Sequence, residues 1–362
     1  MMVISLVLMG GATVAMGLLP DFNAIGIWAP ALLVALRLLQ GIAVGGEWGA
    51  AALMSVEHGP QNKRGFYGSL PAIGAPAGIL LSSAVFSAVS WLVPDDAFIS
   101  WGWRIPFLLS AVLIAFGALV RFSIEESPEF TREQEAVKAA PSASPLVEVV
   151  RRYPKTVAIA AGTYIATAAS FYVVTTWLTS YATGTVGFDR VTVLNVSMVA
   201  SAASIVAILG AGKLSDRFGR KALVTWGSIL FGLYTVPFFL LVNTGNTALF
   251  AIAVVFAMVI LSAVAGPVAA LFAELFETRV RYSGASLSFQ LASVIGGGST
   301  PLICTALLAW SSSTWSICAY IIALNVFALL CIRAIPETKN SRLSTGSPTT
   351  NNSDVDEDLI EA

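Results

Sequence analysis

The stretch G-K-L-S-D-R-F-G-R-K at residues 212–221 carries five charged side chains and lies between two long apolar segments, 192–211 and 222–242. Lysine and arginine resist translocation across a bilayer, so a short basic connection between two membrane-length helices is expected on the cytoplasmic side. The stretch therefore predicts a membrane protein and fixes the direction of two of its helices.

The residue types within this loop carry further expectations. Gly212 and Gly219 are expected to let the backbone turn closely. Asp216 is expected to cap a helix start and to pair with the nearby arginines Arg217 and Arg220.

The composition points to many membrane spans. Hydrophobic residues make up 56% of the 362 residues and charged residues 11%, whereas a typical soluble domain has about 25% charged residues. The mean hydropathy is +0.80. The formal net charge of −1 gives no reason to expect a nucleic-acid partner.

The chemistry-bearing residues argue against an enzyme. The chain has one histidine, His58, and three cysteines in apolar runs, Cys304, Cys318 and Cys331, with no metal-ligand spacing. No nucleotide-binding loop is present either. We expect no metal and no cofactor, and buried, inert thiols.

Ten apolar segments reach the length of about 20 residues that a spanning helix needs. They are expected near residues 2–19, 28–56, 67–93, 102–122, 156–182, 190–211, 222–242, 247–276, 282–309 and 314–335.

Charge and composition divide the chain into parts. Of the 20 lysines and arginines, 17 fall in one set of loops or their borders, which places both termini in the cytoplasm of a multi-pass plasma (inner) membrane protein. The expected organisation is a partial N-terminal bundle (1–122), a cytoplasmic linker (123–155), a six-helix C-terminal bundle (156–337) and a disordered cytoplasmic tail (338–362).

A faint duplication relates the two bundles. Arg64 follows Glu57 by seven residues, and Arg281 follows Glu274 by the same spacing. The second pair lies about 215 residues after the first, and internal repeats of this kind are common in transporters. Counting back by this distance from residues 212–221 reaches the region of Met1. The chain is therefore expected to lack two helices and one copy of the basic loop at its front.

Six further motifs accompany the loop at 212–221. They are L-R-L-L-Q-G-I-A-V-G-G-E-W-G-A-A-A-L-M-S-V-E-H (36–58), R-G-F-Y-G-S (64–69), I-G-A-P-A-G (73–78), W-G-W-R-I-P-F-L-L-S (101–110), E-S-P-E-F (126–130) and A-E-L-F-E-T-R-V-R-Y-S-G-A-S (273–286). Together these motifs resemble the metabolite:proton symporter family of the major facilitator superfamily, and the loop at 212–221 is similar to the superfamily signature G-x-L-x-D-R-x-G-R-R/K.

The resemblance implies an all-α, two-bundle transporter, here with four plus six helices. It implies proton-coupled symport of a small polar metabolite by alternating access, since known members carry organic acids, shikimate, or zwitterions such as proline and betaine. We expect a monomer whose partners are the solute, protons and the lipid bilayer. The alternatives are a sugar-type or facilitative porter, suggested by the acidic proline turns, and a truncated membrane protein that does not transport.

The candidate solute and proton pathway lies on the second segment. Arg37, Gln40 and Glu47 fall on one helical stripe, and charged residues inside a membrane usually face a cavity or a partner. Arg37 would bind the solute and Glu47 would exchange a proton, or the two would form an internal ion-pair strut; the resemblance links R-x-x-Q-G to proton coupling. Tyr164 and Gln290 would line the cavity or only pack.

The second candidate site is a cytoplasmic gate. By resemblance, a charge lock there holds the bundles together when the cavity faces outward; the alternative is that the charges only set topology. The expected members are Glu57, Arg64, Gly212, Asp216, Arg217, Gly219, Arg220, Glu274 and Arg281. Gly296–Gly298 with Pro301 mark a deformable point of the ninth segment, either part of a gate or a passive kink.

Overall fold

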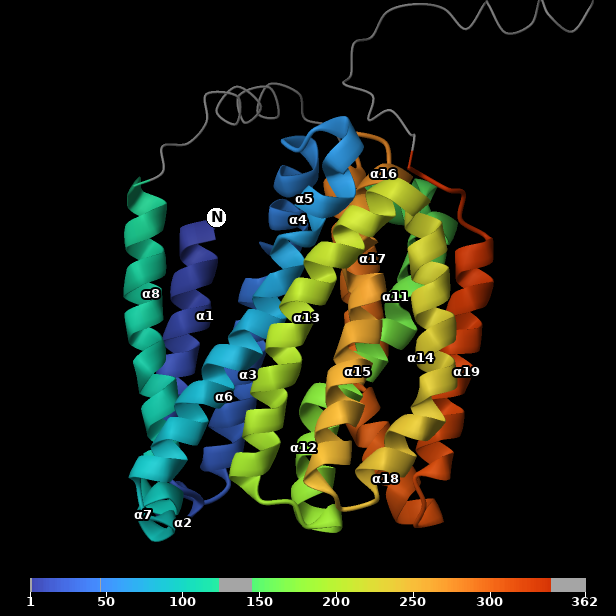
Figure 1. The fold of residues 1–362 in the computed structure, drawn as a ribbon. Coiled ribbons are helices and arrows are strands. Elements are labelled where there is room, and N and C mark those ends of the chain that lie inside the picture. Colours follow the sequence, from blue (N-terminus) through green and yellow to red (C-terminus); the bar gives the residue numbers. More distant parts are fainter. Residues whose placement is uncertain (1, 46, 124–144, 340–362) are drawn as a thin grey trace, which may run out of the picture.

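The computed structural model describes residues 2–45, 47–123 and 145–339, and the regular elements in these ranges are all helices (Figure 1). Within these ranges, eight helical stretches are long and apolar enough to cross a membrane, and there are two shorter apolar helices, Ser5–Gly17 and Gly102–Gly117. The ten predicted apolar segments are therefore confirmed as helices.

The first part of the chain folds into four long helical units joined by short ones. The elements are α1 (Met2–Gly17), α2 (Phe22–Ile25), α3 (Trp28–Gly45), α4 (Glu47–Glu57), η1 (Gln61–Lys63), α5 (Arg64–Ser69), η2 (Pro71–Ile73), α6 (Gly74–Leu92), α7 (Asp95–Ser100), η3 (Gly102–Arg104) and α8 (Ile105–Ser123).

The described part of the second half holds six long helical units, two of which contain the three π-helical turns. The elements are α10 (Pro145–Arg152), α11 (Pro154–Tyr172), η4 (Val173–Trp177), α12 (Leu178–Tyr181), η5 (Ala182–Val186), α13 (Arg190–Phe218), α14 (Arg220–Val242), α15 (Thr247–Ala265), α16 (Val268–Leu275), α17 (Arg281–Ala292), η6 (Ser293–Gly298), α18 (Thr300–Ser311) and α19 (Trp315–Arg333).

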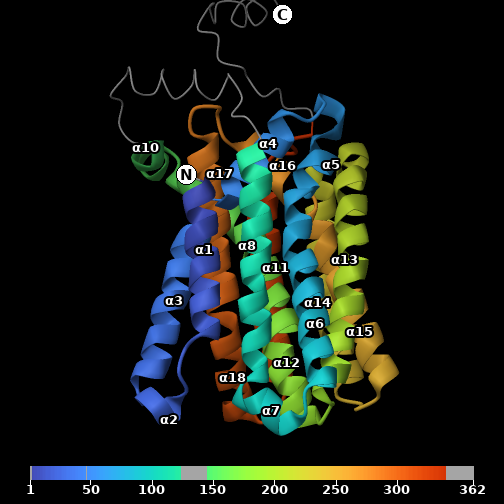
Figure 2. The same cartoon turned by 90° about the vertical axis from the view of Figure 1, so that its left-hand side faces the viewer.

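The helices form a bundle in which the two parts touch along one side. Helix α1 packs between α3 and α8, and these three stand together at one edge (Figures 1 and 2). Helix α6 instead runs along α13 of the second part, with α5 against the same helix. The cross-part contacts of α4 and α5 with α16 and α17 gather at one end, which Figure 1 shows at the top.

Apolar side chains cover both the interior and the outer surface. The main core contains fully buried aromatic residues such as Phe238 and Phe250. Large apolar side chains also point outward, for example Leu302 at 76% and Trp310 at 83% exposure. An apolar exterior of this kind is what a bilayer requires, because lipid tails cannot solvate polar groups.

The basic loop is shorter than the sequence indicates. Helix α13 continues to Phe218 and α14 begins at Arg220, so the connection is the single residue Gly219. Its φ of 102° and ψ of 154° fall in a region that is nearly restricted to glycine. The expectation that Gly212 also serves the turn was wrong, since Gly212 lies within α13.

Replacing Gly219 by alanine is expected to lower the free energy of unfolding by about 1–3 kcal/mol, because a Cβ strains this backbone conformation. The added methyl would also lie 2.5 Å from the Glu337 carboxylate. Thermal unfolding in detergent measures the loss. Gly245→Ala is the matched control, since Gly245 also has a positive φ, of 69°, but open space around it; a larger loss for the control would contradict the role of Glu337.

Two predicted segments lie largely outside the described residues. Of the linker at 123–155, residues 124–144 are not described, and α10 occupies its end; of the tail at 338–362, residues 340–362 are not described. Thr338 and Lys339 belong to the folded end rather than to a tail, since Thr338 is 4% exposed. The domain boundaries themselves stay a prediction.

Candidate functional site: an ionic cluster between the two halves

Asp216 connects the two halves of the chain. Its carboxylate lies in the last turns of α13 and accepts hydrogen bonds from the backbone N–H groups of Gly65 (2.8 Å) and Phe66 (3.0 Å). These are among the first N–H groups of α5, which no residue of α5 itself can satisfy. Asp216 thus caps a helix start, but the helix belongs to the first half of the chain.

Arg220 forms the buried centre of the cluster. Only 1% of its side chain is exposed, and it forms ion pairs with Asp216 (3.1 Å) and Glu274 (3.2 Å). Its Nη1 also donates to the carbonyl of Ser215 (3.2 Å). The Glu274 side chain is fully buried. A guanidinium suits this position because it donates in several directions at once.

The segment that follows α19 fastens the second half of the cluster. The Glu337 carboxylate accepts from the backbone N–H groups of Arg220 (2.9 Å) and Lys221 (3.1 Å) and so caps α14. The Thr338 hydroxyl donates to Glu274 (2.6 Å). Neither Glu337 nor Thr338 was among the gate residues expected from the sequence; the string P-E-T-K at 336–339 was the available signal.

A second ion pair joins the halves nearby. The Arg281 guanidinium contacts the Glu57 carboxylate at 3.0 Å and also donates to the carbonyl of Ala273 (2.9 Å). Arg281 is buried, whereas the Glu57 side chain is 46% exposed. Arg64 is buried at the start of α5 and interacts electrostatically with Glu274 and Arg281. We call this set of residues the ionic cluster. Its members are Glu57, Arg64, Asp216, Arg220, Glu274, Arg281, Glu337 and Thr338.

Close backbone packing supports the cluster. A Cβ added to Gly212 would lie 2.7 Å from the carbonyl oxygen of Gly65, and one added to Gly65 would lie 2.6 Å from the carbonyl oxygen of Gly212. The glycines therefore let α13 and α5 approach closely enough for Asp216 to reach the N–H groups. This is the physical reason for Gly212.

Arg217 stands apart from the other gate residues. Its side chain is exposed and lies over the ring of Phe218, 5.4 Å from the ring centroid. Its backbone carbonyl accepts from Lys339 Nζ (2.6 Å). A depression of about 450 Å³ lies beside it, lined by Lys63, Lys213, Arg217 and four neighbours.

The structure divides the predicted pathway residues. Arg37 is exposed on α3 and donates to Gln40 (3.3 Å), which donates to Thr13 on α1 (2.5 Å). Glu47 is the first residue of α4. Gln290 donates to the carbonyl of Gly45 (3.0 Å) and so bridges the halves.

Tyr164 lies in an aromatic group that also spans the halves. Its ring is 5.1 Å from that of Phe289, and Phe289 stacks on Trp48 of the first half. The roles of all these residues in transport stay predictions.

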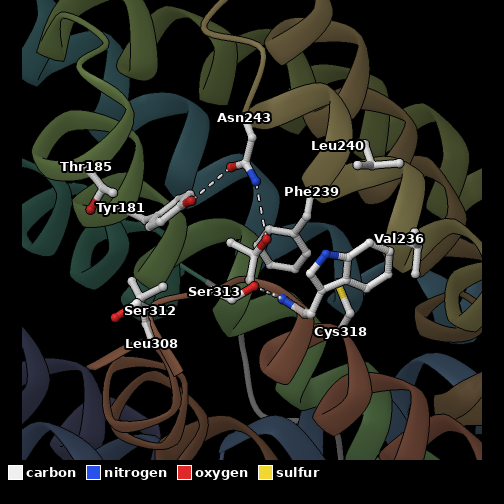
Figure 3. A pocket seen from close by; sticks show the side chains of 12 residues that line it. Tyr181, Thr185, Val236, Phe239, Leu240, Asn243, Leu308, Ser312, Ser313 and Cys318 are labelled. Atoms are coloured by element: carbon white, nitrogen blue, oxygen red, sulfur yellow. Dashed lines mark hydrogen bonds between the residues drawn. The ribbon is translucent and has the colours of Figure 1, made fainter. Parts of the chain in front are cut away.

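A cavity of about 300 Å³ lies at the opposite end of the second half (Figure 3). The Tyr181 hydroxyl donates to Asn243 there (2.9 Å), and Asn243 donates to Thr314 (3.2 Å). No predicted pathway residue lines it. Among the residues that the structure describes, no group of three or more potential metal ligands comes together.

Comparison with known proteins identifies the family. The model of the Major Facilitator Superfamily matches residues 1–297. The shikimate transporter of Escherichia coli (strain K12) is 38% identical over 329 residues, which cover 89% of this chain and 74% of that protein. The glycine betaine/proline/ectoine/pipecolic acid transporter OusA of Dickeya dadantii (strain 3937) is 32% identical over 357 residues, covering 95% and 70%.

The fold agrees with solved structures. The xylose transporter XylE from E. coli superposes with a TM-score of 0.69 at 17% identity, covering 94% of this chain and 81% of that one. The relatives are transporters and not enzymes. This chain is therefore a multi-pass membrane protein that belongs to the major facilitator superfamily of solute transporters.

Proposed function

We propose that this protein is a secondary active transporter that couples uptake of a small organic acid or zwitterion to protons by alternating access. The ionic cluster acts as its cytoplasmic gate. The cluster is intact while that end is closed, and it opens when the cavity turns to the cytoplasm. No bound cofactor takes part, because the proton gradient supplies the energy.

The cap that Asp216 places on α5 carries this proposal. A cap on the N-terminus of a helix from the other half holds the halves together only while they touch. Hydrogen bonds and ion pairs of this kind exchange between two arrangements without breaking either bundle, as a rocking motion needs. If the charges only set the topology, positive charge would be required on the cytoplasmic side, but no acid would need to be buried at the interface between the halves.

The proposed solute class rests on the named relatives and on Arg37. The relatives carry shikimate, or betaine, proline, ectoine and pipecolic acid according to their names, and carboxylate groups fit a guanidinium. Arg37 is an exposed cation within a candidate span. A solute in the central cavity is expected to contact it.

The membrane arrangement completes the proposal. We place the protein in the inner membrane as a monomer, with the ionic cluster on the cytoplasmic side, because the basic residues gather at that end. The lipid bilayer covers its apolar exterior.

Uptake into proteoliposomes tests this function. With the outside acidified, labelled shikimate or proline is expected to accumulate, and an ionophore that dissipates the pH gradient is expected to abolish the accumulation. Equal uptake with and without the gradient would contradict proton coupling and favour a facilitative porter. If neither these solutes nor a wider set of organic acids and zwitterions entered above protein-free liposomes, transport itself would be contradicted.

A further inference from the structure

Helices α4 and α17 pair along their length in an antiparallel register. The Glu57–Arg281 ion pair lies at one end of this pairing, and the hydrogen bond from Gln290 to Gly45, the last residue of α3, lies just beyond the other end. Between them, Gly49 packs directly on the hydroxyl of Ser286. Residue numbers decrease along one helix as they increase along the other, so these contacts follow one another along the helix pair. Each of them is called a rung of the pairing.

One rung of this pairing is aromatic. The Trp48 and Phe289 rings stack at 3.7 Å between centroids with an interplanar angle of 8°. Phe272 approaches Trp48 edge-on at 6.5 Å, and Tyr164 stacks on the other partner of the pair, Phe289. Trp48 thus enters a core cluster whose other members all come from the second half.

The aromatic rung and the ion pair lie at different depths. Trp48 precedes Glu57 by nine residues on α4, which is about 13 Å along a helix axis. Phe289 follows Arg281 by eight residues on α17, about 12 Å in the same direction. The two layers are therefore separated by two turns, and the aromatic layer lies on the membrane side.

The helix changes its winding directly beyond this layer. Helix α17 ends at Ala292 and the π-helical turn η6 spans Ser293–Gly298. Gly296 packs on the carbonyl of Ile165, which leaves no space for a side chain. Such turns lower the cost of bending a helix, so α17 has a bending point next to the aromatic layer.

We propose that Trp48, Phe289 and Tyr164 form a second, apolar layer of the closed gate, which excludes water and ions from the cavity independently of the ionic cluster. This proposal rests on the proposed function, because it assumes that the α4–α17 contact opens during transport. The stack between Trp48 and Phe289 separates when α17 bends at η6. In the closed state, the ionic cluster holds the two halves together, and the aromatic layer excludes water and ions.

Cysteine accessibility tests the aromatic layer without any solute. Ser293 lies one turn beyond Phe289 on the same face of the helix, so Ser293→Cys places a thiol on the membrane side of the layer. Inside-out vesicles are treated with a membrane-impermeant methanethiosulfonate reagent, and peptide mass spectrometry reads the labelling at residue 293 alone, which leaves the native cysteines in place.

The aromatic layer predicts a specific pattern among variants. Trp48→Ala is expected to speed labelling about tenfold or more, since the stack and its buried area are both lost. Trp48→Phe keeps an aromatic ring and is expected to stay within about twofold of the parent protein. Phe289→Leu is measured beside Trp48→Ala, so the result does not depend on one variant; it is expected to label as quickly as Trp48→Ala.

Two results would overturn this inference. Labelling of Trp48→Ala and Phe289→Leu at the parent rate would show that the ionic cluster alone excludes the reagent. Equal acceleration by Trp48→Phe would show that the shape of the indole, and not an aromatic layer, is decisive. The labelling assay uses neither solute nor pH gradient. Its outcome is therefore independent of the uptake experiment, and failure of the one can be told apart from failure of the other.

Discussion

Replacing Arg220 by methionine is expected to lower the free energy of unfolding by about 3–5 kcal/mol and to abolish measurable uptake. The reason is that Arg220 is 1% exposed between the Asp216 and Glu274 carboxylates. Removing the cation leaves two acids at a buried interface without their shared partner, which is the costly way to break a buried ion pair. Thermal unfolding in detergent and uptake into proteoliposomes measure the two effects.

Arg217→Met is the matched control for this prediction. Arg217 lies three residues earlier, near the end of α13, and carries the same charge, but its side chain is exposed. Its replacement is expected to change stability by no more than about 0.5 kcal/mol. Similar losses for the two variants would show that the loop acts through its total positive charge, as a topology signal, and would contradict the gate.

The Glu57–Arg281 pair allows a comparison of the stability lost at an exposed ion pair with that lost at a buried one. Glu57 is 46% exposed, so solvent screens this pair. Glu57→Gln is therefore expected to cost about 1 kcal/mol or less, well below Arg220→Met.

Replacing Gly212 by valine is expected to lower the free energy of unfolding by about 2–4 kcal/mol and to open the gate. Its Cβ would lie 2.6 Å from the Ser69 hydroxyl and 2.7 Å from the carbonyl oxygen of Gly65. The carbonyl cannot yield unless α5 moves, which costs about 1–3 kcal/mol for overpacking. Movement of α5 also breaks the cap that Asp216 places on this helix, which lowers the free energy of unfolding by about 1 kcal/mol more.

Gly210→Val on the same helix is the control. Gly210 is exposed, and an added Cβ would have nothing within 4 Å. This variant is expected to unfold within about 0.5 kcal/mol of the parent protein and to transport normally. Loss of uptake in Gly210→Val as large as in Gly212→Val would show that α13 tolerates no valine in this region, and the close approach to Gly65 would not be the cause.

The local elements followed from the sequence because their causes are local. The length of each apolar segment predicted its helix. The concentration of charge at 212–221 predicted that α13 and α14 are joined tightly. The resemblance, carried by short motifs, gave the family that the comparisons confirm.

The contacts of the gate needed the tertiary structure. Asp216 was expected to act within its own loop, whereas its hydrogen bonds go to Gly65 and Phe66, about 150 positions away in the chain. The turn expected to use both glycines uses only Gly219. Nothing in the local sequence distinguishes a glycine that permits a turn from one that permits two helices to touch.

By itself, the sequence determined that the chain spans a membrane with many helices and that its cationic residues gather at one end, because hydrophobicity and charge act over one segment at a time. Only the tertiary structure decided which cation is buried. Arg217 and Arg220 are alike in type and neighbourhood, yet one lies in the open and the other between two acids. The physical reason is that burial and pairing depend on helices distant in sequence, which only the packed bundle brings together.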